Sequence, residues 1–270
     1  MQENSQNQNP NNLINVTEIS EYCFCPRKLY IKKTKNIREP FNSKMLTGWI
    51  RHRIIELFNK NEPDFVSSIN EHLSREEILK LYENVIRKIS LAMVNENDSR
   101  LKSFKVERLE ILDLVMRKSQ KELMLRAMAV SSGIEQGFLG KKLWENLSPK
   151  YLSEYKISSK ELGITGRIDR VILGDEIIPV EFKNKEKVFE SDKLQLAAYS
   201  LLLEQEFKKK VNRAFIENNQ GNEEIDCEPF KSKVLEIIEK IKNIEQEIPP
   251  MQDNFKKCAS CPFKEVCIKI

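Results

Sequence analysis

The sequence predicts an α/β protein in which helices flank a central mixed β-sheet. Three observations support this class. Apolar residues recur at helical spacing before residue 149, strand-like alternation follows residue 150, and a helix and a further strand come after it. Helices and strands in this order are typical of a sheet covered by helices. We also expect a helical insertion before the sheet and a cysteine-clamped terminal module.

The chain divides into five expected segments. The first twelve residues are mostly Asn and Gln and lack an apolar stretch, which favours a disordered tail over residues 1–15. The other segments are N-terminal helices (16–60), a helical insertion (61–149), a core with the strands (150–217), and a last helix with a cysteine-rich tail (218–270).

The first two helices are predicted at residues 16–33 and 43–59. Thr17 is the expected N-cap of the first helix, with Ser20 as the alternative, and Pro26 is expected to interrupt that helix. An apolar stripe follows the second helix: Leu46, Ile50, Ile54, Leu57 and Phe58.

The stretch from residue 67 to residue 148 is predicted to be almost entirely helical. It contains no proline, and its apolar residues recur at spacings of three and four. It carries no motif of known chemistry. We therefore expect a helical subdomain inserted before the sheet.

Strands and further helices are predicted after residue 150. Gly174 and Asp175 mark a tight turn between the second and third strands. Pro249 and Pro250 end the last helix. The expected elements are strands at 154–158, 163–173, 177–183 and 212–217, helices at 192–207 and 231–247, and a turn at 218–221.

Two carboxylates and a lysine on neighbouring strands form the expected catalytic site. Side chains alternate along a strand, so Glu181 and Lys183 share one face while Val180 and Phe182 face the core. Asp169, on the preceding strand, has to lie beside Glu181 for both to bind one ion. A strict two-residue turn would place Asp169 opposite Val180. We therefore expect a three-residue connection or a bulge.

These residue types suit hydrolysis of a phosphodiester bond. Carboxylates are hard ligands for Mg²⁺ or Mn²⁺, and a bound metal lowers the pKa of a water molecule. Lys183 can position that nucleophile or neutralise the phosphate. Gln195 and Tyr199 share one helix face, where Gln195 can orient the lysine and Tyr199 can stack on a base or hold a phosphate oxygen. The alternative is an ordinary strand with alternating charges, and His52 is either a metal ligand or a surface residue.

Charge and hydropathy agree with a nucleic-acid partner. The formal net charge is only +4, but residues 28–53 contain eight basic residues and a single acid, Glu39. This segment is either a solvated basic face or a phosphate-binding surface. No long apolar segment is visible, which favours a cytoplasmic protein without membrane association. The sequence allows an oligomer but does not specify the oligomeric state.

Cysteines near both ends of the chain suggest a metal centre. Six cysteines in a reducing compartment are more typical of ligands or buried thiols than of disulfides. Cys258, Cys261 and Cys267 are closely spaced, and Cys25 offers a fourth thiolate. Four thiolates suit an iron–sulfur cluster or a structural zinc ion. For Cys227 and Cys23, the pattern favours buried thiols that bind no metal.

Taken together, the motifs resemble the CRISPR-associated RecB-like exonucleases, the fourth Cas protein, within the PD-(D/E)xK nuclease superfamily. The resemblance covers roughly residues 16–60 and 150–270. It rests on Cys25-Pro26-Arg27-Lys28, Gly48-x₃-His52, Gly166-x-x-Asp169, Glu181-Phe182-Lys183, Gln195-x₃-Tyr199 and the three tail cysteines. The helical stretch before the strands is longer than compact members of the family need.

The resemblance implies a restriction-endonuclease-like core and a set of site residues. The catalytic metal would be bound by His52, Asp169 and Glu181, with the backbone carbonyl of Phe182 as a further ligand. The catalytic lysine would be Lys183, and the supporting residues would be Gln195 and Tyr199. A [4Fe–4S] cluster is favoured over zinc, on Cys25, Cys258, Cys261 and Cys267.

The resemblance also implies an activity. It predicts a Mg²⁺- or Mn²⁺-dependent deoxyribonuclease that degrades single-stranded DNA from its ends. In the cell it would trim DNA for CRISPR spacer acquisition, together with the integrase proteins of CRISPR adaptation. No Gly-x₄-Gly-Lys-Ser/Thr phosphate loop is present, so no motor is expected. The alternatives are a weakly catalytic or non-catalytic nucleic-acid-binding subunit of a CRISPR adaptation or DNA repair complex, and a zinc-stabilised nucleic-acid adaptor.

Overall fold

A computed structural model describes residues 13–37, 41–183, 187–218, 221–252, 255–259 and 261–270. The chain divides into two compact units. The sheet unit contains residues 1–39, 155–169 and 177–270, and the helical unit contains residues 40–154 and 170–176.

A mixed β-sheet organises the sheet unit. In the described residues, five strands lie side by side in the order β1 (Ile14–Asn15), β3 (Ile164–Leu173), β4 (Ile177–Phe182), β5 (Arg213–Asn218) and β6 (Gly221–Asp226). A sixth, β2 (Lys150–Ser159), pairs with β3. β1 is parallel to β3 and β4 is parallel to β5, whereas β6 is antiparallel to β5. This arrangement confirms the predicted fold class.

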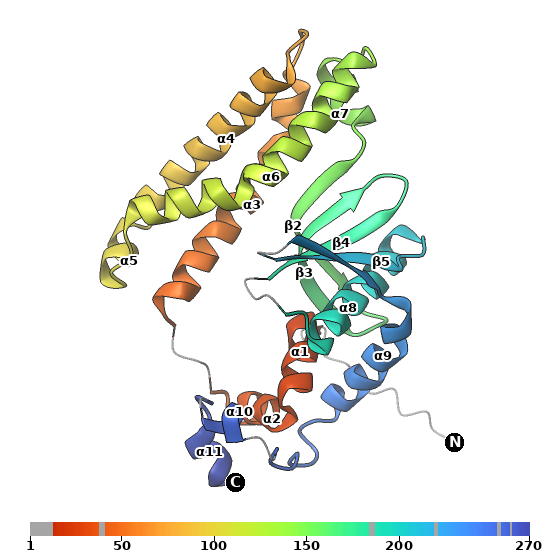
Figure 1. The fold of residues 1–270 in the computed structure, drawn as a ribbon. Coiled ribbons are helices and arrows are strands. Elements are labelled where there is room, and N and C mark those ends of the chain that lie inside the picture. The colour runs from red at the N-terminus through yellow and green to blue at the C-terminus, as the bar shows by residue number, and fades with distance from the viewer. Residues whose placement is uncertain (1–12, 38–40, 184–186, 219–220, 253–254, 260) are drawn as a thin grey trace. The chain divides into compact units, whose positions relative to one another are not determined.

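One helix of the sheet unit lies against the strand that carries the acid–lysine motif. α8 (Glu190–Phe207) packs on β4 and is itself covered by α1 (Val16–Phe24) and α9 (Glu228–Lys242) (Figure 1). α8 is buried continuously from Leu194 to Ser200, as expected for a helix covered from several sides. The remaining helices described in this unit are α2 (Pro26–Thr34), α10 (Phe255–Ala259) and α11 (Lys264–Ile268).

The start of α1 differs from the prediction. Asn15, not Thr17 or Ser20, is the N-cap: its side chain accepts from Thr17 N at 3.0 Å, and Glu18 accepts from Asn15 N at 2.9 Å. This reciprocal pair is a capping box, which satisfies amide groups that the first helical turn leaves unpaired. Asn15 and Ile14, which form β1, fall in the stretch predicted to be a tail, while residues 1–12 lie outside the described residues. The break expected at Pro26 is confirmed, because α2 begins there.

Three long helices make up most of the helical unit. Its long helices are α3 (Ser43–Ser67), α4 (Arg75–Glu96) and α6 (Arg108–Glu135), and the shorter α5 (Asp98–Ser103) and α7 (Gly140–Asn146) connect to them. α3 continues past its predicted end at residue 59 and contains Pro63. Apolar residues of α3, α4 and α6 form one core, among them Ile50, Ile54, Ile78, Ile86 and Val115. No helix in the described ranges is both long and apolar enough to cross a bilayer.

Four buried charged side chains of the helical unit form one network. Arg126 bridges Glu62 and Glu122, and Arg170 lies 3.2 Å from Glu122 Oε2. Tyr82 adds a hydrogen bond to Glu62 at 2.8 Å. Burial acts to raise the pKa of Glu122, but the two guanidinium groups outweigh it and lower that pKa to about 2. Glu122 therefore remains negatively charged at neutral pH.

Removing the central cation of this network should destabilise the fold. We expect Arg126→Met to reduce the free energy of unfolding by about 3–5 kcal/mol, because the buried carboxylates of Glu62 and Glu122 lose the cation between them and Glu122 retains only Arg170. Arg117, on the same helix, pairs with Asp113 at the surface, so Arg117→Met should cost at most about 1 kcal/mol. Urea denaturation of both variants measures the difference, and equal midpoints would show that the buried network is not stabilising.

Candidate active site and metal centre

Two acidic side chains from neighbouring strands meet in the sheet unit. β3 carries Asp169 and β4 carries Glu181, and the connection between the strands is residues 174–176. This is the three-residue connection expected from the sequence. Asp169 Oδ2 accepts a hydrogen bond from Phe182 N at 2.7 Å, which holds the Asp169 carboxylate against β4. The two predicted acids are thus brought together at one place on the sheet.

The Glu181 carboxylate lies in an environment that disfavours its negative charge. Burial and the nearby charge of Asp169 raise its pKa to about 8, although Lys183 acts in the opposite direction. Among the described residues, Glu181 Oε2 is buried and has no hydrogen-bond partner. A divalent cation at this point would offset both carboxylate charges and supply the missing partner. The residues present therefore fit a hard metal ion.

Lys183 follows β4 directly and is held by three side chains. Its ammonium group donates to Glu181 Oε1 at 3.0 Å and to Gln195 Oε1 at 2.9 Å, and lies 3.6 Å from Asp192 Oδ1. Burial acts to lower the pKa of Lys183, but Glu181, Asp192 and Asp169 outweigh it and raise that pKa. Lys183 is therefore a fixed positive charge beside the acidic pair.

The helix α8 supplies the supporting residues at positions i and i+4. Gln195 Nε2 donates to Glu181 Oε1 at 2.8 Å and to the Tyr199 hydroxyl at 3.2 Å. The Tyr199 hydroxyl donates in turn to the Arg167 carbonyl on β3 at 2.9 Å. These bonds connect α8 to both strands of the site. The Tyr199 ring is only 2% exposed, so it is not accessible for the base stacking considered from the sequence.

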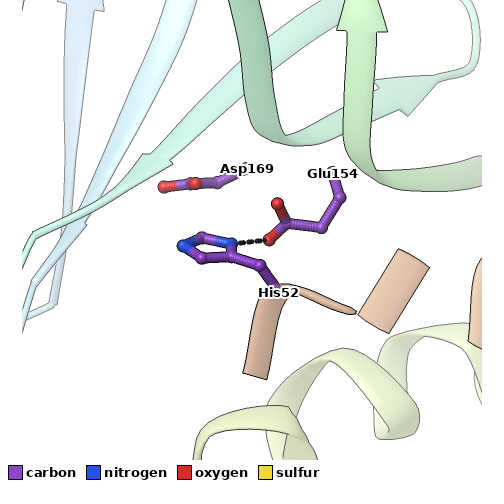
Figure 2. A group of neighbouring side chains, drawn as sticks. All are labelled: His52, Glu154 and Asp169. Atoms are coloured by element: carbon purple, nitrogen blue, oxygen red, sulfur yellow. Dashed lines mark hydrogen bonds and ion pairs between the residues drawn. The ribbon is translucent and has the colours of Figure 1, made fainter. Parts of the chain in front are cut away.

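His52 belongs to the helical unit, where it pairs with a buried acid. Its Nδ1 lies 2.5 Å from Glu154 Oε1. Figure 2 shows this contact as a dashed line. An acid at one imidazole nitrogen fixes the ring and leaves Nε2 for another ligand, an arrangement common around metal-binding histidines. Glu154 has a φ of 55°, an unfavourable backbone conformation for a residue other than glycine. Such conformations persist where the surroundings impose them, often at functional sites.

Comparisons with known proteins identify the family. The PD-(D/E)XK nuclease superfamily matches residues 14–268. The chain belongs to this superfamily. A relative from Leptospira interrogans serogroup Icterohaemorrhagiae serovar Lai (strain 56601), described as "CRISPR-associated exonuclease Cas4/endonuclease Cas1 fusion", is 29% identical over 151 residues. That match covers 48% of this chain and 28% of the relative's length.

The description of the Leptospira relative names the family that the motifs resemble, which confirms that resemblance. A solved structure, described as "Crystal structure of SSO0001", is 16% identical, with a TM-score of 0.32. The matched region covers 83% of this chain and 96% of the chain in that structure.

Two supporting acids of this nuclease-superfamily protein are not apparent from the sequence motifs. Glu154 acts on His52 across 102 positions, so no local pattern marks it. Asp192 is 3% exposed, accepts from Phe189 N at 2.9 Å at the start of α8, and pairs with Lys183. In the sequence, only the position of Asp192 in the first turn of a predicted helix indicates a role for this acid.

The glycine of the Gly166-x-x-Asp169 motif allows close packing within the site. A Cβ atom at Gly166 would lie 2.7 Å from Tyr199 Cε1 and 3.1 Å from Val16 Cγ2. Both neighbours are buried, so neither can move without disturbing the core. Gly166 therefore lets the Tyr199 ring lie directly across β3.

We expect Gly166→Ala to reduce activity by displacing Tyr199. Overpacking at such a position costs about 1–3 kcal/mol of stability, and the shift would also move Gln195 away from Glu181. Cleavage rates and thermal unfolding of Gly166→Ala measure both effects. Gly174→Ala is the control, because the nearest atom to its Cβ would be Pro149 Cβ at 3.6 Å. Normal cleavage by Gly166→Ala would contradict this role of the glycine.

The raised pKa of Glu181 predicts how pH affects the metal-free protein. Between the ordinary carboxyl pKa near 4.3 and the folded value of about 8, the folded chain keeps a proton that the unfolded chain releases. Stability should therefore fall as pH rises through this window, by about 1 kcal/mol per pH unit. Urea denaturation in EDTA at pH 6 and pH 8 tests this, with Glu181→Gln as a variant that lacks the dependence. Equal pH slopes for the two proteins would contradict it.

Four cysteines from the two ends of the chain line one cavity of the sheet unit. They are Cys25, Cys258, Cys261 and Cys267. Cys25 is the N-cap of α2, and its sulfur accepts a hydrogen bond from Lys28 N at 3.4 Å. Arg27 donates to the carbonyls of Pro249 and Cys267 at 2.8 and 3.1 Å, which binds α2 to the tail. Four thiols around one cavity, together with the cationic side chain of Lys28, fit a thiolate-ligated centre.

Proposed function

We propose that this chain is a metal-dependent deoxyribonuclease that degrades single-stranded DNA from its ends and trims DNA for CRISPR spacer acquisition. The observation that supports it best is the buried Glu181 oxygen without a partner, next to Asp169 and beside the Lys183 ammonium group. Membership of a nuclease superfamily supports hydrolysis of nucleic acid. The exonuclease named in the description of the Leptospira relative supports action at DNA ends.

In this proposal the metal ligands are the residues that the family resemblance implies. Asp169 and Glu181 would hold Mg²⁺ or Mn²⁺, with His52 and the Phe182 carbonyl as the further ligands that the resemblance implies. Oxygen ligands with a single imidazole suit these hard ions. When bound, the metal lowers the pKa of the attacking water and offsets the charge that develops on the phosphate.

The protein side chains position the reactants. Lys183 neutralises the scissile phosphate or orients the attacking water, because its ammonium group is held by the site rather than free in solvent. Gln195 fixes the lysine and Glu181 at once, and Tyr199 fixes Gln195 to β3. Glu154 keeps the His52 ring in one orientation.

We further propose that the four cysteines hold a [4Fe–4S] cluster. The observation in support is the shared cavity with its hydrogen bond from Lys28 N to the Cys25 sulfur. The relative's description joins an exonuclease to an integrase-type endonuclease, which supports a CRISPR adaptation integrase as the protein partner.

Cleavage of labelled DNA tests the proposed activity. Anaerobically purified protein is incubated with end-labelled linear single strands, linear duplexes and circular single strands, in Mg²⁺, Mn²⁺ or EDTA. We expect metal-dependent shortening of linear single strands and little cleavage of circles, which have no ends. Cleavage of circles as fast as of linear strands would reject the exonuclease, and binding without cleavage in either metal would favour a non-catalytic subunit.

A further inference from the structure

An exposed aromatic patch lies on the helical unit, close along the chain to His52. Trp49 on α3 is 44% exposed, and Phe41, just before α3, is 43% exposed. Trp49 precedes His52 by three residues, so the two lie within one turn, about 4.5 Å apart along the helix axis. Exposed apolar side chains that cluster, unlike those scattered singly, often mark an interaction surface.

A cation holds the two rings of this patch. The guanidinium carbon of Arg100, on α5, lies 5.0 Å from the centre of the Trp49 ring and 5.9 Å from that of Phe41. Phe41 also meets Phe104 edge to face, with ring centres 5.5 Å apart. Cation–π and edge-to-face contacts fix ring orientation. The rings are thus held in place while remaining accessible.

The charge around the patch favours an anionic ligand. Exposed basic residues are present on both segments that form it: Lys44 on α3, and Arg100, Lys102, Lys105 and Arg108 on α5 and after it. Residues 98–108 contain two acids, Asp98 and Glu107. Asp98 is paired with Lys102 at 2.8 Å and with Arg108 at 3.0 Å. Basic charge with accessible aromatic rings is the combination that binds single-stranded nucleic acids.

A glycine leaves the helix backbone bare beside the patch. Gly48 lies between Trp49 and the preceding turn, four residues before His52, and a Cβ atom built on it would meet no described atom within 4 Å. Glycine is unfavourable inside a helix because its backbone has the most entropy to lose. No described protein atom nearby requires a glycine here, whereas the backbone of an approaching ligand would.

We propose that Trp49, Phe41 and Arg100 form a stacking platform for single-stranded DNA, whose sugar–phosphate backbone passes over Gly48 towards His52. This inference rests on the proposed function, because it concerns how the single-stranded substrate is held. Bases of a single strand expose faces that stack on aromatic rings and on guanidinium groups, whereas duplex bases are stacked on one another. The platform would hold the strand without reading its sequence.

The chain's two tryptophans allow a direct test. Trp144, also in the helical unit, is half-buried and has the Lys150 ammonium group 5.0 Å from its ring centre, so it is a matched control. Trp144→Phe leaves Trp49 as the sole tryptophan, and Trp49→Phe leaves Trp144. On addition of oligo-dT in EDTA, we expect fluorescence quenching in Trp144→Phe and little in Trp49→Phe. Equal quenching in both, or none in Trp144→Phe, would overturn the platform.

Affinity measurements test the energetic contribution. We expect Trp49→Ala to weaken oligo-dT binding about ten-fold in fluorescence anisotropy and to leave duplex binding little changed. Met128→Ala is the control, because it removes an apolar side chain that is 46% exposed and lies about 30 Å along α6 from Arg108. Gly48→Ala should maintain or raise the melting temperature while weakening oligo-dT binding at least about five-fold. Unchanged affinity in Trp49→Ala and Gly48→Ala would reject the proposal.

The two proposals fail in different ways. Binding is measured without metal, so a protein that does not cleave DNA can still show quenching of Trp49, which would support the platform and reject the nuclease. An active exonuclease whose Trp49→Ala variant binds and cleaves like the parent would reject the platform alone.

Discussion

Asp169→Asn and Lys183→Met are each expected to slow cleavage of single-stranded DNA by at least about a thousand-fold. The first substitution removes a carboxylate charge from the metal site. The second keeps the length of the side chain but removes the ammonium group that lies 3.0 Å from Glu181. Single-turnover rates with excess protein measure the chemical step, and anisotropy in EDTA verifies that both variants still bind DNA.

A lysine outside the site provides the matched control. Lys231 is as well paired as Lys183, with Glu204 at 2.8 Å and Glu228 at 2.7 Å, and it lies on α9. Lys231→Met should lower thermal stability and leave the cleavage rate of the folded protein nearly unchanged. If Lys183→Met cleaves at the parental rate, or Lys231→Met is equally inactive while folded, Lys183 has no special part in the reaction.

Cys261→Ala is expected to remove the iron–sulfur cluster and to loosen the terminal module. The parent purified without oxygen should contain about four irons per chain and absorb broadly in the visible range. A cluster that joins Cys25 to the tail cysteines closes a loop of more than 200 residues, so its loss should cost about 3–5 kcal/mol, similar to a long-loop cross-link. Iron analysis, absorption spectra and thermal unfolding measure these effects.

Other cysteines show whether the effect is specific. Cys23→Ser should retain the iron, because Cys23 does not line the cavity that the four cysteines share. Cys227 is a buried core thiol, and Cys227→Ala should lower stability without loss of iron. One zinc per chain in place of iron would overturn the cluster, and unchanged unfolding of iron-free Cys261→Ala would overturn its role as a clamp.

Much of the fold follows from local sequence, and the exceptions have physical causes. A proline inside a helical pattern interrupts the helix and suits the first turn of a new one. The break between α1 and α2 at Pro26 was therefore predictable. β6 was missed, because it is polar and almost wholly exposed and has no alternating pattern. Its pairing with β5 defines it, and that pairing is a property of the folded chain.

The candidate site shows the same division. The spacing of Glu181, Lys183, Gln195 and Tyr199 indicates one cluster, and the structure brings these side chains into hydrogen-bond contact. His52 pairs with Glu154, which is 102 positions away in the sequence. Arg126 pairs with Glu62, which is 64 positions away. Sequence periodicity indicates that these helices are amphipathic, but it does not show which charged residues are buried together.

Manganese binding measures most directly whether Asp169 and Glu181 share a metal ion. Mn²⁺ is titrated into the parent, Asp169→Asn and Glu181→Gln, with free Mn²⁺ followed by electron paramagnetic resonance. Since each carboxylate supplies a ligand charge, we expect each variant to bind Mn²⁺ at least about ten-fold more weakly than the parent. Parental affinity in both variants would show that these carboxylates do not hold the ion.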